Sequence, residues 1–356
     1  MKSFVSYIDL FSHIYITSEV YELPSVRKAL NRLPGIPVKI VKSKENLPPE
    51  YLNSKTLFVT SHTGETVGRC PGSRGHICCN YLTVDLYLGC PIGCSYCIMK
   101  SYLNFAPLTV YADTGPSIKR IQAIAEHNRD RIIRIGTGEV GDSLLLDPLF
   151  ELTASFITGF SMYKNLYFEA KTKTANIDHL LDIQNKGNAV IGFSVNPREI
   201  VEAEEGTSDS LDDRLNAAEK AVKAGYNVSF HFDPIFFSAD WENRYFSVVD
   251  AFKRFPEDKI SWISLGTFRY PPELRDKIGG RPYLFGEFFP GKDRKYRYLQ
   301  KIRVEVYKRM LEKIKSVCRT PVYLCMESGV VWEKVFGRLP GKIPGYEGIF
   351  KPPRLY

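Results

Sequence analysis

The stretch that decides the fold is "YLTVDLYLGCPIGCSYCIMK", residues 81–100, in which an apolar strand pattern runs directly into a loop with three cysteines. Cys90, Cys94 and Cys97 follow the spacing C-x3-C-x2-C, with Gly89 and Gly93 beside them. Buried structural cysteines do not usually share a glycine-bearing loop at this spacing, which is typical of metal binding. Three thiolates from one loop suit a [4Fe–4S] cluster, because they hold three corners and leave the fourth iron open. The alternative, a non-catalytic zinc protein, would need a fourth ligand, and no second C-x2-C pair is present.

Outward from this loop, apolar strand patterns alternate with helical patterns. Six such units predict a parallel α/β sheet with strands buried on both faces. Periodicity leaves open whether the sheet is flat or curls into a barrel, but in a barrel the site lies at the C-terminal ends of the strands. The predicted core strands are "YLTVDLYL", "IIRIGTG", "LYFEAKT", "AVIGFSV", "NVSFHFDPI" and "KISWISLGTF".

The flanking segments predict three regions in the chain. A small N-terminal α/β domain is predicted over residues 1–80, from three strand patterns and a helix that opens at Pro24. The core is predicted over residues 81–285, and a C-terminal extension with a long amphipathic helix over residues 286–356.

The composition is that of a soluble globular protein, and it limits the classes of protein to be considered. The 356 residues are 44% hydrophobic and 25% charged, as is usual for soluble globular proteins. We recognise neither a long apolar span nor a signal peptide, and we expect a cytoplasmic protein without a membrane partner. In a reducing compartment clustered cysteines more often bind metal than form disulfides. The net charge of +8 is compatible with a polyanionic partner but also with enzymes that bind none.

The cysteine loop after the first core strand resembles that of the radical S-adenosylmethionine (SAM) enzymes. The resemblance implies a partial (β/α)6 barrel of the TIM type, a [4Fe–4S] cluster on the three loop cysteines, and SAM bound at the open iron. It also implies that polar residues at the ends of the next strands contact SAM. On sequence alone the first of these groups, "GTGE", is equally compatible with a plain strand-to-loop turn. The implied SAM contacts are Gly136, Thr137, Gly138, Glu139, Lys173 and Ser194.

Further segments resemble spore photoproduct lyase, a radical SAM family that reverts a methylene-bridged thymine dimer, 5-thyminyl-5,6-dihydrothymine, in DNA. The resemblance runs from about residue 60 to residue 310 and includes "CSYC", "KTANIDHLLD", "FSVNP", "EEGTSDSLDDRLNAAEKAVKAGY", "DPIFFSADWENRYF" and "RKYRY". It implies that a 5′-deoxyadenosyl radical removes a hydrogen from the dihydrothymine half, that the bridge then breaks, and that a hydrogen donor quenches the thymine radical. It also implies an electron donor such as flavodoxin or ferredoxin.

The sequence departs from this family in the hydrogen donor. The family's donor is a cysteine after the second core strand, whereas "IGTGEVGDSLLLD" contains none and the donor position falls near Glu139. Ile98 also stands where the family has a tyrosine after the third cluster cysteine. The candidate catalytic residues are therefore Tyr96, Cys78 and Cys79. The two thiols are also compatible with buried residues or with a structural pair that includes Cys70.

The segment "GKDRKYRYLQKIR", residues 291–303, combines cations with aromatic rings. Cations contact phosphates, and aromatic rings stack on or wedge between bases. The segment is also compatible with the solvated start of an amphipathic helix. The predicted nucleic-acid contacts are Arg294, Lys295, Tyr296, Arg297 and Tyr298.

Together these observations predict a radical SAM enzyme that repairs the thymine photoproduct in DNA. The same enzyme class acting on RNA or on a small metabolite is the alternative.

Overall fold

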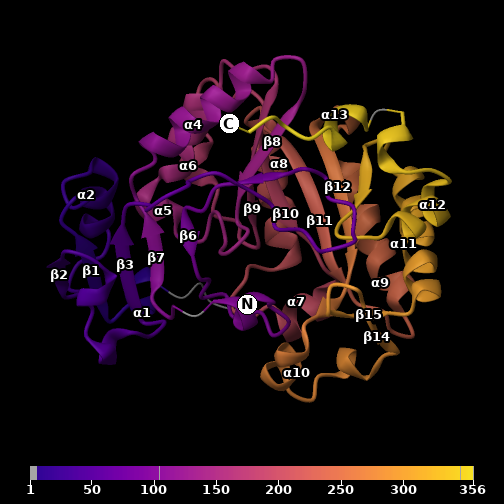
Figure 1. Ribbon diagram of the computed structural model, residues 1–356, viewed down its shortest axis with the longest axis horizontal. Helices are drawn as coiled ribbons and strands as arrows, with labels where there is room; N and C mark the ends of the chain where they lie inside the picture. The colour runs from indigo at the N-terminus through magenta and orange to yellow at the C-terminus, as the bar shows by residue number, and fades with distance from the viewer. Residues whose placement is uncertain (1–5, 104, 345, 356) are drawn as a thin grey trace.

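The computed structural model describes residues 6–103, 105–344 and 346–355 (Figure 1). Its centre is an eight-stranded sheet in the order β16-β12-β11-β10-β9-β8-β5-β4, parallel except for the antiparallel pair β4 and β5. The strands are β4 (Gly68–Arg69), β5 (Leu82–Thr83), β8 (Ile133–Thr137), β9 (Leu166–Thr172), β10 (Ala189–Ser194), β11 (Asn227–Ile235), β12 (Ile260–Thr267) and β16 (Val322–Leu324).

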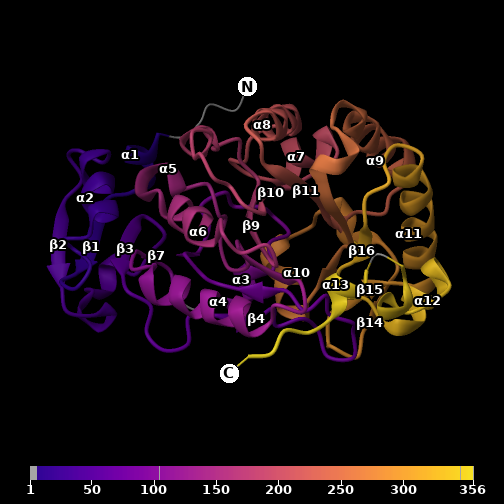
Figure 2. The same ribbon diagram turned by 90° about the horizontal axis from the view of Figure 1, so that it is seen from above.

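This sheet curls into the partial barrel that the sequence predicts. The central strands are buried nearly end to end, because helices cover their outer face and the chain's loops close the inner one (Figure 2). The covering helices are α4 (Gly115–His127), α6 (Leu152–Phe160), α7 (Arg198–Glu204), α8 (Leu211–Lys223), α9 (Trp241–Asp250) and α11 (Gln300–Lys315). A further strand near the C-terminus, β16, joins the barrel beside β12.

The first predicted core strand is wrong as a single element. The structure breaks residues 81–88 into β5 and β6 (Tyr87–Leu88), and the two halves belong to different sheets. The break follows Val84, whose backbone N–H still bonds Gly136 in the barrel, whereas Tyr87 pairs with Val110 in the N-terminal sheet.

Two of the helical patterns that alternate with the predicted strands, residues 149–160 and residues 177–186, also differ from the structure. Residues 177–186 form only a short 3-10 turn, Asp178–Leu180, since tertiary contacts override the helical pattern: the Leu180 carbonyl accepts from Tyr226, and His179 bonds Asp147. The helix predicted over residues 149–160 is interrupted by Glu151, which has φ +55° and is held by ion pairs to Lys28 and Arg32.

The N-terminal sheet has the order β2-β1-β3-β7-β6 and lies beside the barrel. It takes in β6 and β7 from beyond residue 80, while β4, before residue 80, pairs with the barrel. One apolar core runs through both sheets, so the boundary near residue 80 stays a prediction. The new elements are β1 (His13–Thr17), α2 (Pro24–Asn31), β2 (Val38–Val41), β3 (Thr56–Thr60) and β7 (Leu108–Tyr111).

The C-terminal region adds a small antiparallel sheet in the order β13-β15-β14, on the side of the barrel where α10 (Pro272–Ile278) lies. Helices α12 (Gly329–Phe336) and α13 (Glu347–Phe350) follow β16. In the described part of the chain, none of the helices combines the length and apolar character that a membrane span requires. The strands are β13 (Arg269–Tyr270), β14 (Phe288–Pro290) and β15 (Tyr296–Tyr298).

Candidate active site

A cavity of about 320 Å³ lies at the C-terminal ends of the barrel strands. This is the edge at which barrels of parallel strands carry their sites, because the strand-to-helix loops converge there. Its wall draws residues from the cysteine loop, from the ends of five neighbouring strands, and from the segments around residues 70–81 and 325–326. They include Cys90, Cys94, Cys97, Glu139, Asp142, Lys171, Lys173, Ser194, His231, Asp233, Arg269 and Cys325.

The cysteine loop places all three predicted ligands on this wall, and all three thiols are free. Gly89 and Gly93 have φ of +88° and +76°, the left-handed region that glycine adopts without strain. The loop rests on Gly206, where a Cβ atom would lie 1.8 Å from the Ile92 carbonyl oxygen. Only a glycine permits this approach, so the segment "EEGT" supports the cysteine loop from below.

The donor set fits an iron–sulfur cube better than a single ion. Among the described residues, no three His, Cys, Asp or Glu side chains gather closely enough to hold one metal ion. A cube needs wider spacing, since each thiolate binds a different iron. Burial raises the pKa of Cys94 to about 12 and that of Cys90 well above its usual value, with Lys173 partly opposing the effect at Cys94.

A buried polar network fixes Tyr96 between the second and third cysteines. Its hydroxyl donates to Glu205, which also accepts from Asn196 at 2.8 Å and from Arg214 at 2.6 Å. The side chains of Glu205 and Arg214 are both 0% exposed. Burial would raise the pKa of Glu205, but Arg214 and Lys173 outweigh it and lower the pKa to about 2. The carboxylate therefore stays charged and locks the loop to the barrel. This network was not predicted from the sequence, although "EEGT" belongs to a segment that carries the family resemblance.

The predicted SAM contacts are only partly brought together. Gly138, Glu139, Lys173 and Ser194 line the cavity. Gly136 and Thr137 lie behind it at the end of β8, where a Cβ on Gly136 would meet the Tyr81 hydroxyl at 1.8 Å. The first two residues of the motif "GTGE" therefore pack within the barrel, and the last two line the cavity.

Four charged groups on the wall form two pairs. Glu139 lies 3.9 Å from Lys171, and Asp233 lies 3.0 Å from Arg269. Burial would lower the pKa of Lys171, but Glu139 and Glu169 outweigh it, so the ammonium stays charged. Polar strand-end positions were the signal that could have found Lys171 and Asp233.

A second group of thiols lies across the cavity. Cys70, Cys79 and Cys325 line it, whereas Cys78 is not among the lining residues and hydrogen-bonds Cys70 and Cys79. An antiparallel bridge between Ile77 and Glu327 brings the two segments together. The hydrogen bond that Cys78 donates lowers the pKa of Cys79 to about 6, and Arg134 and Lys171 contribute further.

The floor of the barrel carries an unpredicted polar cluster around Glu169. This buried carboxylate accepts from Tyr81 at 2.7 Å and from Trp262 at 2.9 Å, and it bonds His231 at 2.8 Å. Burial would raise its pKa, but the interaction with His231 and the charges of Lys171 and Arg134 hold it well below the usual range. His231 is therefore a hydrogen-bonded core residue, as its place on an apolar strand predicts.

Residues 291–298 of the predicted nucleic-acid segment form the turn and second strand of a hairpin, and residues 300–303 begin α11. Lys295, Arg297 and Tyr298 are buried, and Arg297 is paired with Asp293 at 2.6 Å. Tyr296 is half-buried and stacks on another tyrosine ring. Of the five predicted contacts, Arg294 alone is exposed. The burial of these side chains was not visible in the sequence, because it depends on the turn and on the pairing of β15 with β13 and β14.

A partial barrel with a three-cysteine loop at its C-terminal edge defines the radical SAM class of fold. Within that class, the chain belongs to the spore photoproduct lyase family, whose sequence profile matches residues 77–266. The resemblance found in the sequence is confirmed.

Three curated spore photoproduct lyases match parts of the chain. The protein of Geobacillus sp. is 31% identical over 175 residues, or 48% of this chain and 50% of that protein. The protein of Bacillus subtilis is 26% identical over 46% of this chain and 49% of its own length. The chain therefore spans about half the length of these two relatives. The protein of Clostridium acetobutylicum is 22% identical over 73% of this chain and 79% of its own length.

The fold also matches solved structures. A spore photoproduct lyase variant with bound AdoMet and dinucleoside spore photoproduct aligns with a TM-score of 0.75 at 21% identity. The alignment covers 88% of this chain and 98% of that chain. This likeness confirms the fold predicted from the sequence.

Proposed function

We propose that this chain is a radical SAM enzyme that repairs a thymine photoproduct in DNA. The observation that carries the proposal is that Cys90, Cys94, Cys97, Lys173 and Ser194 line one cavity at the strand ends. Family membership and the relatives that bind AdoMet and a dinucleoside spore photoproduct support it. The reductant would be a small electron carrier such as flavodoxin or ferredoxin.

The chain's residues divide the work as follows. Cys90, Cys94 and Cys97 would hold a [4Fe–4S] cluster, while Glu139 and Lys173 would orient the amino and carboxylate groups of SAM. The bound cofactors would supply a 5′-deoxyadenosyl radical for hydrogen abstraction. The polar network on Tyr96 keeps the loop rigid, so that the three thiolates stay in place without reorganisation.

The hydrogen donor in this proposal is Cys79 rather than Cys78. Cys79 lines the cavity opposite the cysteine loop, and Cys78 does not. Donation breaks the Cys79 S–H bond, forms a C–H bond on the thymine radical, and leaves a thiyl radical on Cys79. Cys78 hydrogen-bonds Cys79 and controls whether that thiol carries its proton.

The test is a repair assay with labelled photoproduct in DNA, run on anaerobically reconstituted and reduced protein. We expect thymine to form, and we expect Cys79→Ala to lose most of that yield while it keeps its cluster and still cleaves SAM. Cys318→Ala, at a buried cysteine outside the cavity, is the matched control. No thymine from the parent protein would reject the lyase activity, and an unchanged yield in Cys79→Ala would reject the donor.

One observation favours a second candidate, the same chemistry on RNA or a small metabolite. Glu139 lies where the family's donor is expected, and it forms an ion pair with Lys171 inside the cavity. A charged pair at that place suits a substrate with more polar groups than thymine. The two candidates separate in the repair assay, since the second predicts SAM cleavage without repair.

A further inference from the structure

A small basic hollow of about 270 Å³ lies beside the cavity. It is formed by the loop that follows Cys70 and by the turn of the hairpin between β14 and β15. Its lining residues are Gly72, Ser73, Arg74, Lys292, Asp293, Arg294 and Lys295.

The two segments of this hollow are held against each other. Lys295 Nζ donates to Ser73 Oγ at 3.2 Å, and the aliphatic stem of Lys292 lies 3.9 Å from the Cβ position of Gly75. The turn is closed by a bond from Gly291 N–H to the Lys295 carbonyl oxygen at 2.8 Å. Arg294 has φ +63°, a conformation that non-glycine residues adopt at some cost. The hollow is therefore a built feature, not a chance meeting of mobile side chains.

Its four cations outnumber its one carboxylate, that of Asp293. Lys295 is only 8% exposed, and burial followed by the charge of Arg269 lowers the pKa of Lys295. The carboxylate of Asp293 is bound to Arg297 at 2.6 Å. In the described part of the chain, Arg74, Lys292, Arg294 and Lys295 form no ion pair with a carboxylate. A buried ammonium without an acid costs free energy unless an anion approaches it.

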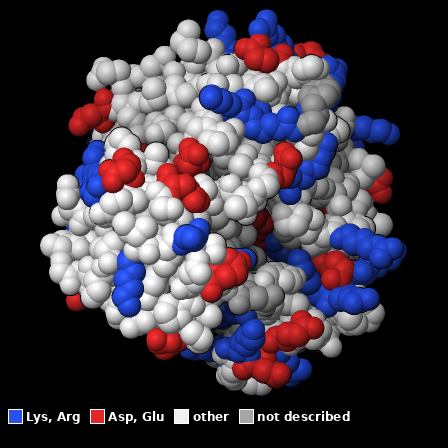
Figure 3. All heavy atoms as spheres, turned by 60° about the vertical axis from the view of Figure 1, so that its left-hand side comes forward, with Lys and Arg blue, Asp and Glu red and all other residues white. Residues whose placement is uncertain are grey.

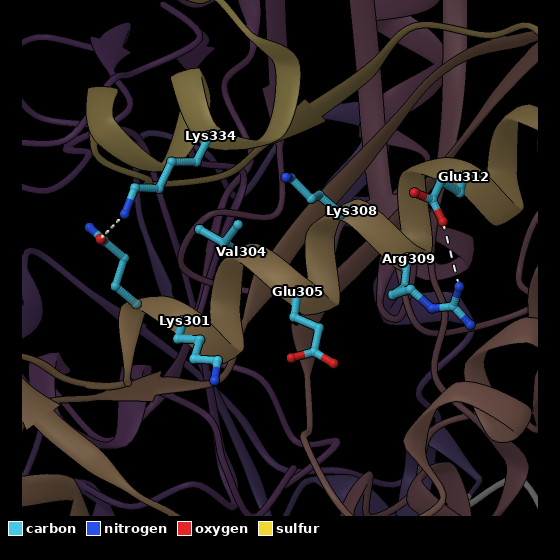
Figure 4. Close-up of a pocket in the computed structure, with 8 residues that line it drawn as sticks. Lys301, Val304, Glu305, Lys308, Arg309, Glu312 and Lys334 are labelled. Atoms are coloured by element: carbon cyan, nitrogen blue, oxygen red, sulfur yellow. Dashed lines mark hydrogen bonds and ion pairs between the residues drawn. The ribbon is translucent and has the colours of Figure 1, made fainter.

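A depression on the outer face of α11 differs from this hollow in its balance of charge. The depression has four cations, but acidic and amide groups accompany them (Figure 4). Arg309 pairs with Glu242 and Glu312, and Lys334 donates to Gln300 at 3.0 Å. Over the face drawn in Figure 3, basic and acidic side chains are likewise interspersed.

The position of the hollow points to its ligand. The Ser73 hydroxyl lies 3.4 Å from the sulfur of Met326, and Met326 lines the cavity wall. Arg269, on the same wall, lies 3.3 Å from that sulfur. An anion in the hollow would thus sit at the rim of the cavity, one side chain away from it.

We propose that this hollow binds a backbone phosphodiester of the nucleic-acid strand whose base enters the cavity. The inference rests on the proposed function in taking a nucleic acid as the substrate. Lys295 and Ser73 hold one oxygen of the phosphate from below, and Arg74, Lys292 and Arg294 surround it from the solvent side. Charged hydrogen bonds of this kind fix the position of the strand without reading its sequence.

The experiment compares two single-stranded oligothymidylates that differ in one linkage, a phosphodiester or an uncharged methylphosphonate. Binding is measured by fluorescence anisotropy with a labelled strand. For the parent protein we expect the methylphosphonate to bind about tenfold more weakly, as the loss of one charged hydrogen-bonding group implies. For Lys295→Gln and Arg74→Gln we expect that difference to fall to about twofold or less.

Lys308→Gln is the matched control, since Lys308 is exposed on α11 and lines the depression on that helix rather than the hollow. It should keep the tenfold difference. Circular dichroism checks that Lys295→Gln is folded. If it is not, Arg74→Gln still tests the site, because Arg74 is exposed and its replacement should leave the fold intact.

Two results would overturn the site: no discrimination between the linkages by the parent protein, or the same discrimination in all variants. Displacement of the strand by submillimolar inorganic phosphate would assign the hollow to free phosphate instead. Binding that follows our expectation while repair fails would keep the site and reject the lyase activity, so the two failures are distinguishable.

Discussion

The two cysteine-bearing loops of the cavity hold their thiols in opposite ways. In the loop of residues 90–97, Cys94 and Cys97 share one turn, closed by a bond from the Cys97 N–H to the Cys94 carbonyl oxygen at 3.3 Å, and the Cys90 thiol interacts with the other two electrostatically. In the loop of residues 70–79, Cys78 hydrogen-bonds both Cys70 and Cys79. Thiols that are not hydrogen-bonded to one another suit an iron–sulfur cluster, in which each thiolate binds a different iron. Thiols that are hydrogen-bonded to one another can share a proton. Residue type alone therefore does not give the role of a cysteine here.

The largest expected effect tests the loop of residues 90–97. Cys90→Ala should lower the iron and sulfide bound after anaerobic reconstitution to background, because the remaining thiolates hold only two corners of a cube. Cys79→Ala should bind as much iron as the parent protein. If metal analysis found zinc without sulfide, or unchanged iron in Cys90→Ala, the loop of residues 90–97 would not be the site of an iron–sulfur cluster.

The next effect concerns the support under that loop. Glu205→Ala should lower the free energy of unfolding by about 3–5 kcal/mol, because Arg214 would keep a buried charge without its partner. Asp212→Ala removes the acid of an ion pair that is 57% and 55% exposed, and should cost about 1 kcal/mol or less. Urea denaturation measures both. Equal losses in the two variants would mean that the buried network does not stabilise the loop.

The loop of residues 70–79 predicts a pH effect. The pKa of Cys79 is lowered to about 6, chiefly by the hydrogen bond from Cys78, so the thiolate should form as the pH rises through that value. The rate of Cys79 alkylation by iodoacetamide should then rise with a midpoint near pH 6. In Cys78→Ala the midpoint should move up toward about 8.5, the value for a free thiol.

Mass spectrometry of each cysteine gives the rates. A midpoint that stays in place in Cys78→Ala would show that Arg134 and Lys171, rather than the neighbouring thiol, set the acidity of Cys79. As a hydrogen donor Cys79 needs its proton, so the thymine yield should fall as the pH rises through the same midpoint.

These two loops also show what the sequence could predict. The C-x3-C-x2-C spacing is local, and three ligands from one loop must face one another, so the cluster site was predictable. The parallel strands were predictable too, because burial on both faces leaves continuous apolar runs such as residues 189–193. The break at residues 84–87 was not, because both halves are equally apolar and only long-range pairing separates them.

The buried charges that support the cysteine loop could not be predicted from local sequence patterns, for a related reason. Glu205 and Arg214 look like ordinary helix-end and helix-surface charges in the sequence, and only the fold buries them against Tyr96. The same holds for the hairpin, where Arg297 and Tyr298 point to opposite faces of β15 and both are buried, whereas Arg294 lies at the turn. Side-chain direction in a short strand depends on register, and a one-residue change of register would reverse it.

The smallest expected effect concerns Tyr96, and it separates a role in holding the cysteine loop from a role in the radical chemistry. Tyr96→Phe keeps the ring, which packs edge-on against Phe236 at 5.3 Å, and removes the hydrogen bond to Glu205 together with the longer one, 3.5 Å, that the hydroxyl accepts from Asn196. Because Glu205 still accepts from Asn196 and Arg214, the free energy of unfolding should fall by about 1–2 kcal/mol, less than in Glu205→Ala.

Cluster content should stay near that of the parent protein, while the rate of cluster loss to a chelator should rise because the loop is less firmly held. Tyr102→Phe, at a hydroxyl on an exposed residue, is the control and should change neither quantity. If Tyr96→Phe abolished the thymine yield with stability and cluster intact, Tyr96 would be part of the radical chemistry as well as of the loop's support, and the contrast between a purely structural loop and a reactive one would no longer hold.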